Sequence, residues 1–164
     1  MDENTINNFW MEGDSLAPPC QTDADVIDVI LRFAVLSQDS FVFDLGCGDG
    51  RICIEASLRY GCRSCGVEIE EKLTYLFRRR IDELKLHDLV TAVHGDLLDL
   101  DLSEATVIIL YLLPDAIKIL EPKLAAAVRS GKKLICNTWG PKSLIPTKKV
   151  VCGQLNNIEI LLYG

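Results

Sequence analysis

The sequence predicts an α/β fold in which helices cover both faces of a mostly parallel sheet and an antiparallel hairpin forms its C-terminal part. Short apolar runs alternate with stretches of helical periodicity from about residue 22 onward, as in strands joined by crossover helices. The first apolar run leads into three glycines at alternate positions, Gly46, Gly48 and Gly50. Near the C terminus, two β-prone runs flank residues 153–157, whose composition favours a hairpin turn. The length of 164 residues fits one domain.

The first predicted element is a helix. Thr22 and Asp25 have the spacing of a hydroxyl cap and an acid three residues on, and apolar residues at helical spacing continue to Ala34. The elements expected after it are a strand at 41–45, a helix at about 51–60, a strand ending at Glu68 and an amphipathic helix from 70 to about 86. Because a helix separates each pair of strands, we expect these strands to be parallel.

The second half continues the same alternation. The expected elements are a strand at 89–94, an apolar strand at 106–112, a helix opened by Pro114 and Asp115, a strand at 132–137, and hairpin strands at 148–152 and 158–163. These complete a sheet of seven strands.

Residues 1–21 form a separate segment in this scheme. They are polar and include two adjacent prolines, 18 and 19. We expect either a mobile arm, or a lid that orders on ligand binding, with Phe9 and Trp10 as aromatic anchors that dock on the site, or a frayed terminus. The predicted domain is therefore 22–164.

Polar side chains stand at the ends of four predicted strands, at Asp44, Glu68, Asp96 and Tyr111. In a doubly wound sheet the ligand lies beyond the carboxyl ends of the strands, near the point where the strand order reverses. Glu68 follows Gly46 by 22 positions, and a glycine turn with a strand-end carboxylate about 20 residues later is how α/β folds hold a nucleoside. The sequence therefore predicts a nucleoside-containing cofactor.

The glycine turn disfavours a dinucleotide. Its spacing is GxGxG instead of GxGxxG, and Asp44 and Asp49 crowd the helix N terminus that would receive a pyrophosphate. A cofactor with a cationic or zwitterionic tail suits these acids better.

Composition limits the partners. The net charge of −7 gives no broad basic footprint for nucleic acid, and the run Arg78 to Arg80 is expected to be a solvated helix face. The apolar run from Val107 to Pro114 is too short to span a bilayer.

An odd number of cysteines, seven, favours a reducing cytoplasm. Cys62 and Cys65 have CxxC spacing, but without a second ligand pair they are expected to pack in the core instead of binding metal.

The motifs Asp44-Leu-Gly-Cys-Gly-Asp-Gly50, Gly66-Val-Glu68 and Gly95-Asp96 resemble the successive motifs of class I, seven-strand S-adenosylmethionine-dependent methyltransferases. The resemblance implies a Rossmann-like fold in which the glycine turn receives the methionine part of the cofactor and Asp44 faces its amino group. It also implies that Glu68 holds the ribose hydroxyls, and that Asp96 bonds the adenine amino group near the Leu97 amide. The cofactor-binding residues that it implies are Asp44, Gly46, Cys47, Gly48, Gly50, Glu68, Ile69, Asp96 and Leu97.

A narrower resemblance concerns the methyl acceptor. Asp49-Gly-Arg51-Ile, Gly66-Val-Glu-Ile69 and Leu102 to Pro114 resemble a subgroup of small enzymes related to protein-lysine methyltransferases. After the fourth strand the sequence is Tyr111-Leu-Leu-Pro114, without the asparagine pair of the histone-lysine enzyme and without the Asn/Asp-Pro-Pro motif of relatives that methylate amides and bases. This departure disfavours adenine and glutamine nitrogens as acceptors.

The sequence therefore predicts a methyltransferase with protein lysine as the favoured acceptor and no metal. Tyr111 is the candidate catalytic residue, which would orient the incoming amine, or else a core aromatic; Trp139 would form a second wall, or else pack on the hairpin. Two alternatives stay open, namely a small-molecule or RNA methyltransferase and a non-catalytic cofactor-binding subunit that needs a partner.

Overall fold

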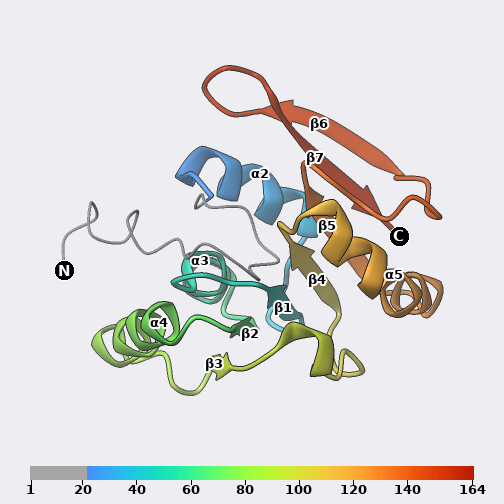
Figure 1. Ribbon diagram of the computed structural model, residues 1–164. Helices are drawn as coiled ribbons and strands as arrows, with labels where there is room; N and C mark the ends of the chain where they lie inside the picture. The colour runs from blue at the N-terminus through green and yellow to red at the C-terminus, as the bar shows by residue number, and fades with distance from the viewer. Residues whose placement is uncertain (1–21) are drawn as a thin grey trace.

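The computed structural model describes residues 22–164 and contains one seven-stranded sheet in the order β3-β2-β1-β4-β5-β7-β6. Figure 1 shows β3 at one edge of the sheet and the β6–β7 hairpin at the other. The strands are β1 (Phe41–Leu45), β2 (Arg63–Glu68), β3 (Val90–His94), β4 (Val107–Leu110), β5 (Lys133–Asn137), β6 (Lys148–Cys152) and β7 (Ile158–Tyr163). The first five strands are parallel, and β7 pairs antiparallel with both β5 and β6. This confirms the predicted doubly wound α/β fold.

Helices cover both faces of the sheet. They are α2 (Ala24–Ala34), α3 (Arg51–Tyr60), α4 (Glu71–Glu83), α5 (Pro114–Arg129) and the short 3₁₀ helix η1 (Leu97–Asp99). On one face α5 packs on side chains that include Leu110 and Leu134, whereas α2 and α3 pack on the other against Val42 and Ile109. A third cluster around Phe77 joins α4 to α3 and β3. The alternation of inward side chains along each central strand produces these two cores.

Two expected helix boundaries are wrong. The Thr22 hydroxyl does not cap α2: Asp23 is the N-cap, without a side-chain bond. The helix predicted to reach residue 86 ends at Glu83, because Lys85 adopts the left-handed conformation with φ of 55°. The amide of Leu86 then donates to the Ile81 carbonyl at 3.0 Å, which is the bond pattern of a Schellman motif.

The expectations outside the sheet have different outcomes. Within residues 22–164, no helix is both long and apolar enough to cross a bilayer. Cys62 and Cys65 are buried and unbridged, as expected for core residues, and no group of metal-ligating side chains occurs in this part of the chain. The predicted arm or lid at residues 1–21 lies outside the described residues.

Candidate functional site

The strand register aligns the predicted site residues along the carboxyl edge of the sheet. Glu68 pairs with His94, and Leu45 pairs with Val67 and Leu110, so the next residues, Glu68, Gly46 and Tyr111, lie level on three adjacent strands. Neighbouring strands are about 4.8 Å apart. The order reverses between β1 and β4, which places Gly46 and Tyr111 on the two sides of the switch point where such sheets bind ligands.

The three motif glycines all adopt positive φ, but they serve different needs. Gly46, Gly48 and Gly50 have φ of 76°, 60° and 80°. A Cβ on Gly48 would meet no atom of residues 22–164 within 4 Å, so the space beside it is open in this part of the structure. A Cβ on Gly50 would lie 1.9 Å from the Phe77 ring. Gly48 therefore leaves space for a ligand beside the turn, whereas Gly50 is required by packing against Phe77 of α4.

Cys47 faces the protein interior beneath this turn. Its side chain is 6% exposed, and a Cβ on Gly66 of β2 would come within 2.6 Å of its sulfur. Burial raises the pKa of the Cys47 thiol well above its usual value. The residue therefore offers its backbone to the open side of the turn and an inert thiol to the core.

Glu68 connects the end of β2 to the glycine turn. Its carboxylate accepts hydrogen bonds from the amide of Gly48 at 2.8 Å and from the amides of Ile69 and Glu70 at 3.1 Å each. Burial raises the pKa of Glu68, and these amides partly offset that effect. A carboxylate fixed in this way is a rigid acceptor, and since these amides use three of its about four lone-pair sites, about one remains for a ligand hydroxyl unless an amide is displaced.

Asp44 is the most deeply buried acid of the site. The residue, on β1, is 4% exposed, and burial raises its pKa to about 7, with further contributions from the charges of Glu68 and Asp49. Three carboxyl groups beside one turn create a negative potential. A cationic ligand group would relieve that potential and favour the ionised form of Asp44.

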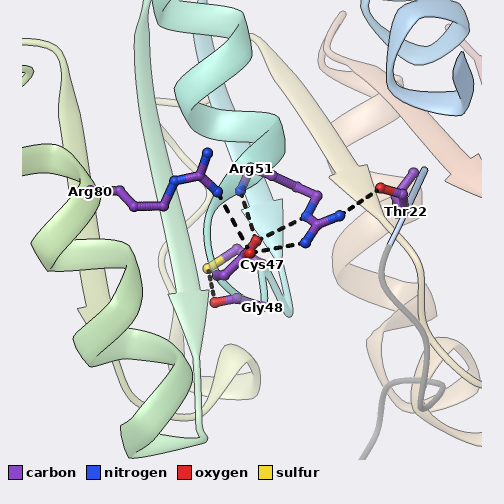
Figure 2. Close-up of polar contacts among 6 residues, drawn as sticks. Thr22, Cys47, Gly48, Arg51 and Arg80 are labelled. Atoms are coloured by element: carbon purple, nitrogen blue, oxygen red, sulfur yellow. Dashed lines mark hydrogen bonds and ion pairs between the residues drawn. The ribbon is translucent and has the colours of Figure 1, made fainter. Parts of the chain in front are cut away.

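Asp49 forms ion pairs with two arginines that the sequence did not reveal. Its carboxylate accepts from Nε and a terminal nitrogen of Arg51 at 3.1 and 3.0 Å, and Arg80 lies 3.6 Å away. Figure 2 shows the two guanidinium groups converging from α3 and α4. Arg51 also donates to the Thr22 carbonyl at 3.3 Å. Asp49 therefore joins α3 to α4, and Arg51 links this pair to the segment just before α2. Arg80 is thus not part of a merely solvated face.

At the β3 end, an apolar side chain lies beside the acids. Ile69, directly after Glu68, is 57% exposed, and its carbonyl is 3.0 Å from Nε2 of His94. Asp96 is exposed and caps η1 by accepting from the Leu98 amide at 2.9 Å, while Leu97 is half-buried. Ile69 follows β2, and Asp96 follows the neighbouring strand β3. An exposed apolar side chain and an acid at adjacent strand ends suit a flat heterocycle with an amino group.

At the β4 end, two aromatic rings lie together. Tyr111 follows β4, and Trp139 lies two residues after β5. Their rings stack with centroids 6.1 Å apart and planes inclined by 23°, and both residues are half-buried. Tyr111 is therefore part of an aromatic pair at the switch point, and Trp139 contributes its ring to the same place.

These residues fit a sulfonium-containing nucleoside. The open space at Gly48 could receive a ligand against the backbone, and Asp44 and Glu68 supply negative charge and hydroxyl acceptors next to it. Ile69 and Asp96 provide an apolar contact and an acceptor at the β3 end. The chemistry of the donor set therefore agrees with S-adenosylmethionine.

Comparison with known proteins supports this conclusion. Residues 44–148 match the ANTKMT methyltransferase domain. The chain is 33% identical over 150 residues to a protein-lysine N-methyltransferase of Saccharolobus islandicus (strain REY15A), covering 88% of this chain and 91% of that protein.

Solved structures agree. An RNA methyltransferase from Salinibacter ruber in complex with S-adenosyl-L-homocysteine superimposes with a TM-score of 0.79 at 31% identity, over 88% of this chain and 92% of that one. A SAM-dependent methyltransferase from Geobacter sulfurreducens, also with S-adenosyl-L-homocysteine, shares the fold with a TM-score of 0.59 at 21% identity, over 82% and 53% of the two chains. The chain belongs to the ANTKMT methyltransferase domain family and is an S-adenosylmethionine-dependent methyltransferase.

Proposed function

We propose that this enzyme N-methylates lysine side chains of proteins. The observation that carries the proposal is the stacked pair Tyr111–Trp139, which lies level with the glycine turn where amide- and base-methylating relatives have a polar motif. Aromatic faces suit an alkyl chain that ends in an amine, since they desolvate the chain and attract its cationic form. The relative from Saccharolobus islandicus, whose name specifies protein lysine, supports the same acceptor.

The cofactor site of this proposal extends across three strands. The backbone from Gly46 to Gly50, Cys47 included, would receive the methionine part, with Asp44 facing the amino group. Glu68 would accept the ribose hydroxyls, and Ile69 would pack on the adenine. Asp96, with the Leu97 amide beside it, would bond the adenine edge. Residues 22–164 would form the methyltransferase domain.

The chemistry requires alignment more than acid–base catalysis. S-adenosylmethionine supplies a methyl group already activated on a sulfonium. Tyr111 would orient the neutral amine in line with that group, and positioning of this kind can contribute about 7–11 kcal/mol toward the barrier. Desolvation of the amine as it enters the site would lower the lysine pKa and so favour the neutral nucleophile, with the proton leaving to solvent.

The charge distribution disfavours RNA as the acceptor. The net charge is −7, and several cations are already engaged within the fold. Nζ of Lys123 donates to the carbonyls of Leu98 and Leu100 at 3.1 and 2.7 Å. Lys133 donates to a carbonyl of α2, and Arg59 pairs with Asp28. Neutralising phosphates would require a separate basic surface.

The six described cysteines are unbridged, which supports a reducing cytoplasm as the location of the enzyme. Such a location would bring it into contact with cytoplasmic proteins as substrates.

Label transfer tests the acceptor. The purified protein is incubated with methyl-labelled S-adenosylmethionine and an undermethylated cell lysate, and label is counted in protein, nucleic acid and small-molecule fractions. We expect label in protein that acid hydrolysis recovers as methyllysine, and none with Glu68→Ala. Label in nucleic acid or small molecules alone would refute the lysine assignment. Label that appears only when a second protein is added would show that the enzyme needs a partner subunit.

A further inference from the structure

We infer that the stacked rings of Tyr111 and Trp139 bind the methylated ammonium of the acceptor and thereby set how many methyl groups one lysine receives. The inference rests on the proposed function and deepens it. It follows from the position of the two rings, from the backbone that holds Trp139, and from the chemistry of an aromatic surface in an acidic site.

The position comes from the register. Leu110 of β4 pairs with Leu45 on one side and with Cys136 of β5 on the other. Tyr111 is therefore level with Gly46 on the adjacent strand, about 4.8 Å away. Trp139 lies at the same edge of the sheet, after the next strand, β5. The two rings therefore lie on the β4 and β5 side of the glycine turn, where they could contact an acceptor nitrogen before and after it has been methylated.

The backbone before Trp139 is held in an unfavourable conformation. Thr138 has φ of 68°, and the Trp139 amide donates to the Asn137 carbonyl at 2.8 Å, which closes a γ-turn. Such turns with positive φ are rare and strained, and a β-branched residue is a clear outlier there. The conformation persists because the Thr138 amide donates to the Glu159 carbonyl of β7 at 2.7 Å and its hydroxyl to the Asn137 side chain at 2.8 Å.

Packing after Trp139 enforces the same geometry. A Cβ on Gly140 would lie 2.1 Å from the hydroxyl oxygen of Tyr163, so a larger residue here would force the Tyr163 ring or the chain after Trp139 to shift. The indole is thus fixed from both sides by elements of the antiparallel part of the sheet. The strained backbone at Thr138 lies at the edge of the sheet that carries the site, and the surrounding bonds maintain it. Strain of this kind indicates a functional role for the Trp139 ring that it orients.

The chemistry gives that role. A methylammonium is bulkier, less hydrated and as charged as the original ammonium, so it gains from aromatic faces while it loses little to water. A ring pair that retains this product next to the cofactor site allows further transfer, with one proton lost to solvent before each step. We therefore expect the wild-type enzyme to produce di- and trimethyllysine.

A binding measurement tests the inference without turnover. Trp10→Phe leaves Trp139 as the single tryptophan of the chain, so its fluorescence reports on the pair. In saturating S-adenosyl-L-homocysteine, this variant is titrated with N-acetyl-trimethyllysine methylamide and with the neutral analogue that carries a tert-butyl group. We expect the cation to bind about 2- to 30-fold more tightly. Equal affinities would overturn the inference.

The product distribution provides the second readout. Mass spectrometry of a methylated protein substrate should show a shift toward monomethyllysine with Trp139→Ala and a partial return with Trp139→Phe, while both bind S-adenosyl-L-homocysteine as the wild type does. An unchanged distribution in Trp139→Ala would also overturn the inference. If the wild type discriminates the two probes but methylates no lysine, the proposed acceptor is wrong and the ammonium site stands.

Discussion

Alanine substitutions at two glycines of the cofactor turn are expected to have different effects: one should weaken cofactor binding and the other should destabilise the fold. Among the described residues, no atom lies within 4 Å of a Cβ on Gly48, whereas alanine at Gly50 would place its Cβ 1.9 Å from the Phe77 ring. Both positions have positive φ, 60° and 80°. The two substitutions thus add the same methyl group to the same turn under similar backbone strain. They differ in whether that methyl group enters the core or the open space beside the turn.

The expected magnitudes follow from this geometry. An L-residue in the left-handed region costs about 1–2 kcal/mol, and the smaller entropy of the unfolded alanine chain returns about 0.4–1 kcal/mol. Gly48→Ala should therefore lower the free energy of unfolding by about 0–1.6 kcal/mol. Gly50→Ala adds overpacking of about 1–3 kcal/mol, giving about 1–4.6 kcal/mol in total. With an m-value of about 2 kcal/mol/M, the urea midpoint of Gly50→Ala should fall by about 0.5–2.3 M.

Urea unfolding and calorimetric titration with S-adenosyl-L-homocysteine measure the two effects. We expect Gly48→Ala to be nearly as stable as the wild type but to bind at least about tenfold more weakly, because the methyl group fills ligand space. Gly50→Ala should lose stability, and Phe77→Leu in the same chain should recover part of that loss as a coupling of about 0.5–3 kcal/mol. Equal stability losses for the two alanine variants, without coupling to Phe77, would refute the reasoning.

Four further predictions concern charges and packing around the site. Because the pKa of Asp44 is raised to about 7, the folded state binds the extra proton, so stability should fall as pH rises from about 4 to 7 and then level off; Asp44→Asn should remove this dependence in urea titrations. The affinity for S-adenosyl-L-homocysteine should rise over pH 6 to 8 in the wild type and stay flat in Asp44→Asn, because an ionised Asp44 favours the cofactor's ammonium. Asp49→Asn should lower the free energy of unfolding by about 1–3 kcal/mol, more than Arg80→Gln, whose side chain is 44% exposed; equal losses would contradict the bidentate pair with Arg51. Gly140→Ala should lower the melting temperature, and Tyr163→Phe should restore part of it; no restoration would show that the close approach is absent.

Much of the fold could be predicted because its signals are local. Apolar runs bounded by turn residues gave the bounds of β1 and of the β6–β7 hairpin. The end of α4 could not be predicted, because it depends on Lys85 adopting a conformation that usually requires glycine. The first cap was missed because backbone groups, not the Thr22 hydroxyl, complete the first turn of α2.

The site residues could be predicted where a local motif marks the end of a single strand. Glu68 and Gly46 follow from the motif and its spacing, and the register then sets them level. The reason for Gly50 could not be foreseen, since Phe77 lies 27 positions away in the sequence. Neither could the pairing of Asp49 with Arg80, or the stack of Tyr111 on Trp139, because each depends on how distant elements pack.

Titration calorimetry with S-adenosyl-L-homocysteine on the wild type, Glu68→Ala and Arg79→Gln tests the central claim most directly. Arg79 is a control on α4, with a side chain 58% exposed that pairs with Glu83. The account predicts saturable binding of one equivalent to the wild type and to Arg79→Gln, and a loss of at least about tenfold, or 1.4 kcal/mol, for Glu68→Ala. Binding that is absent in the wild type, or unchanged in Glu68→Ala, would contradict it.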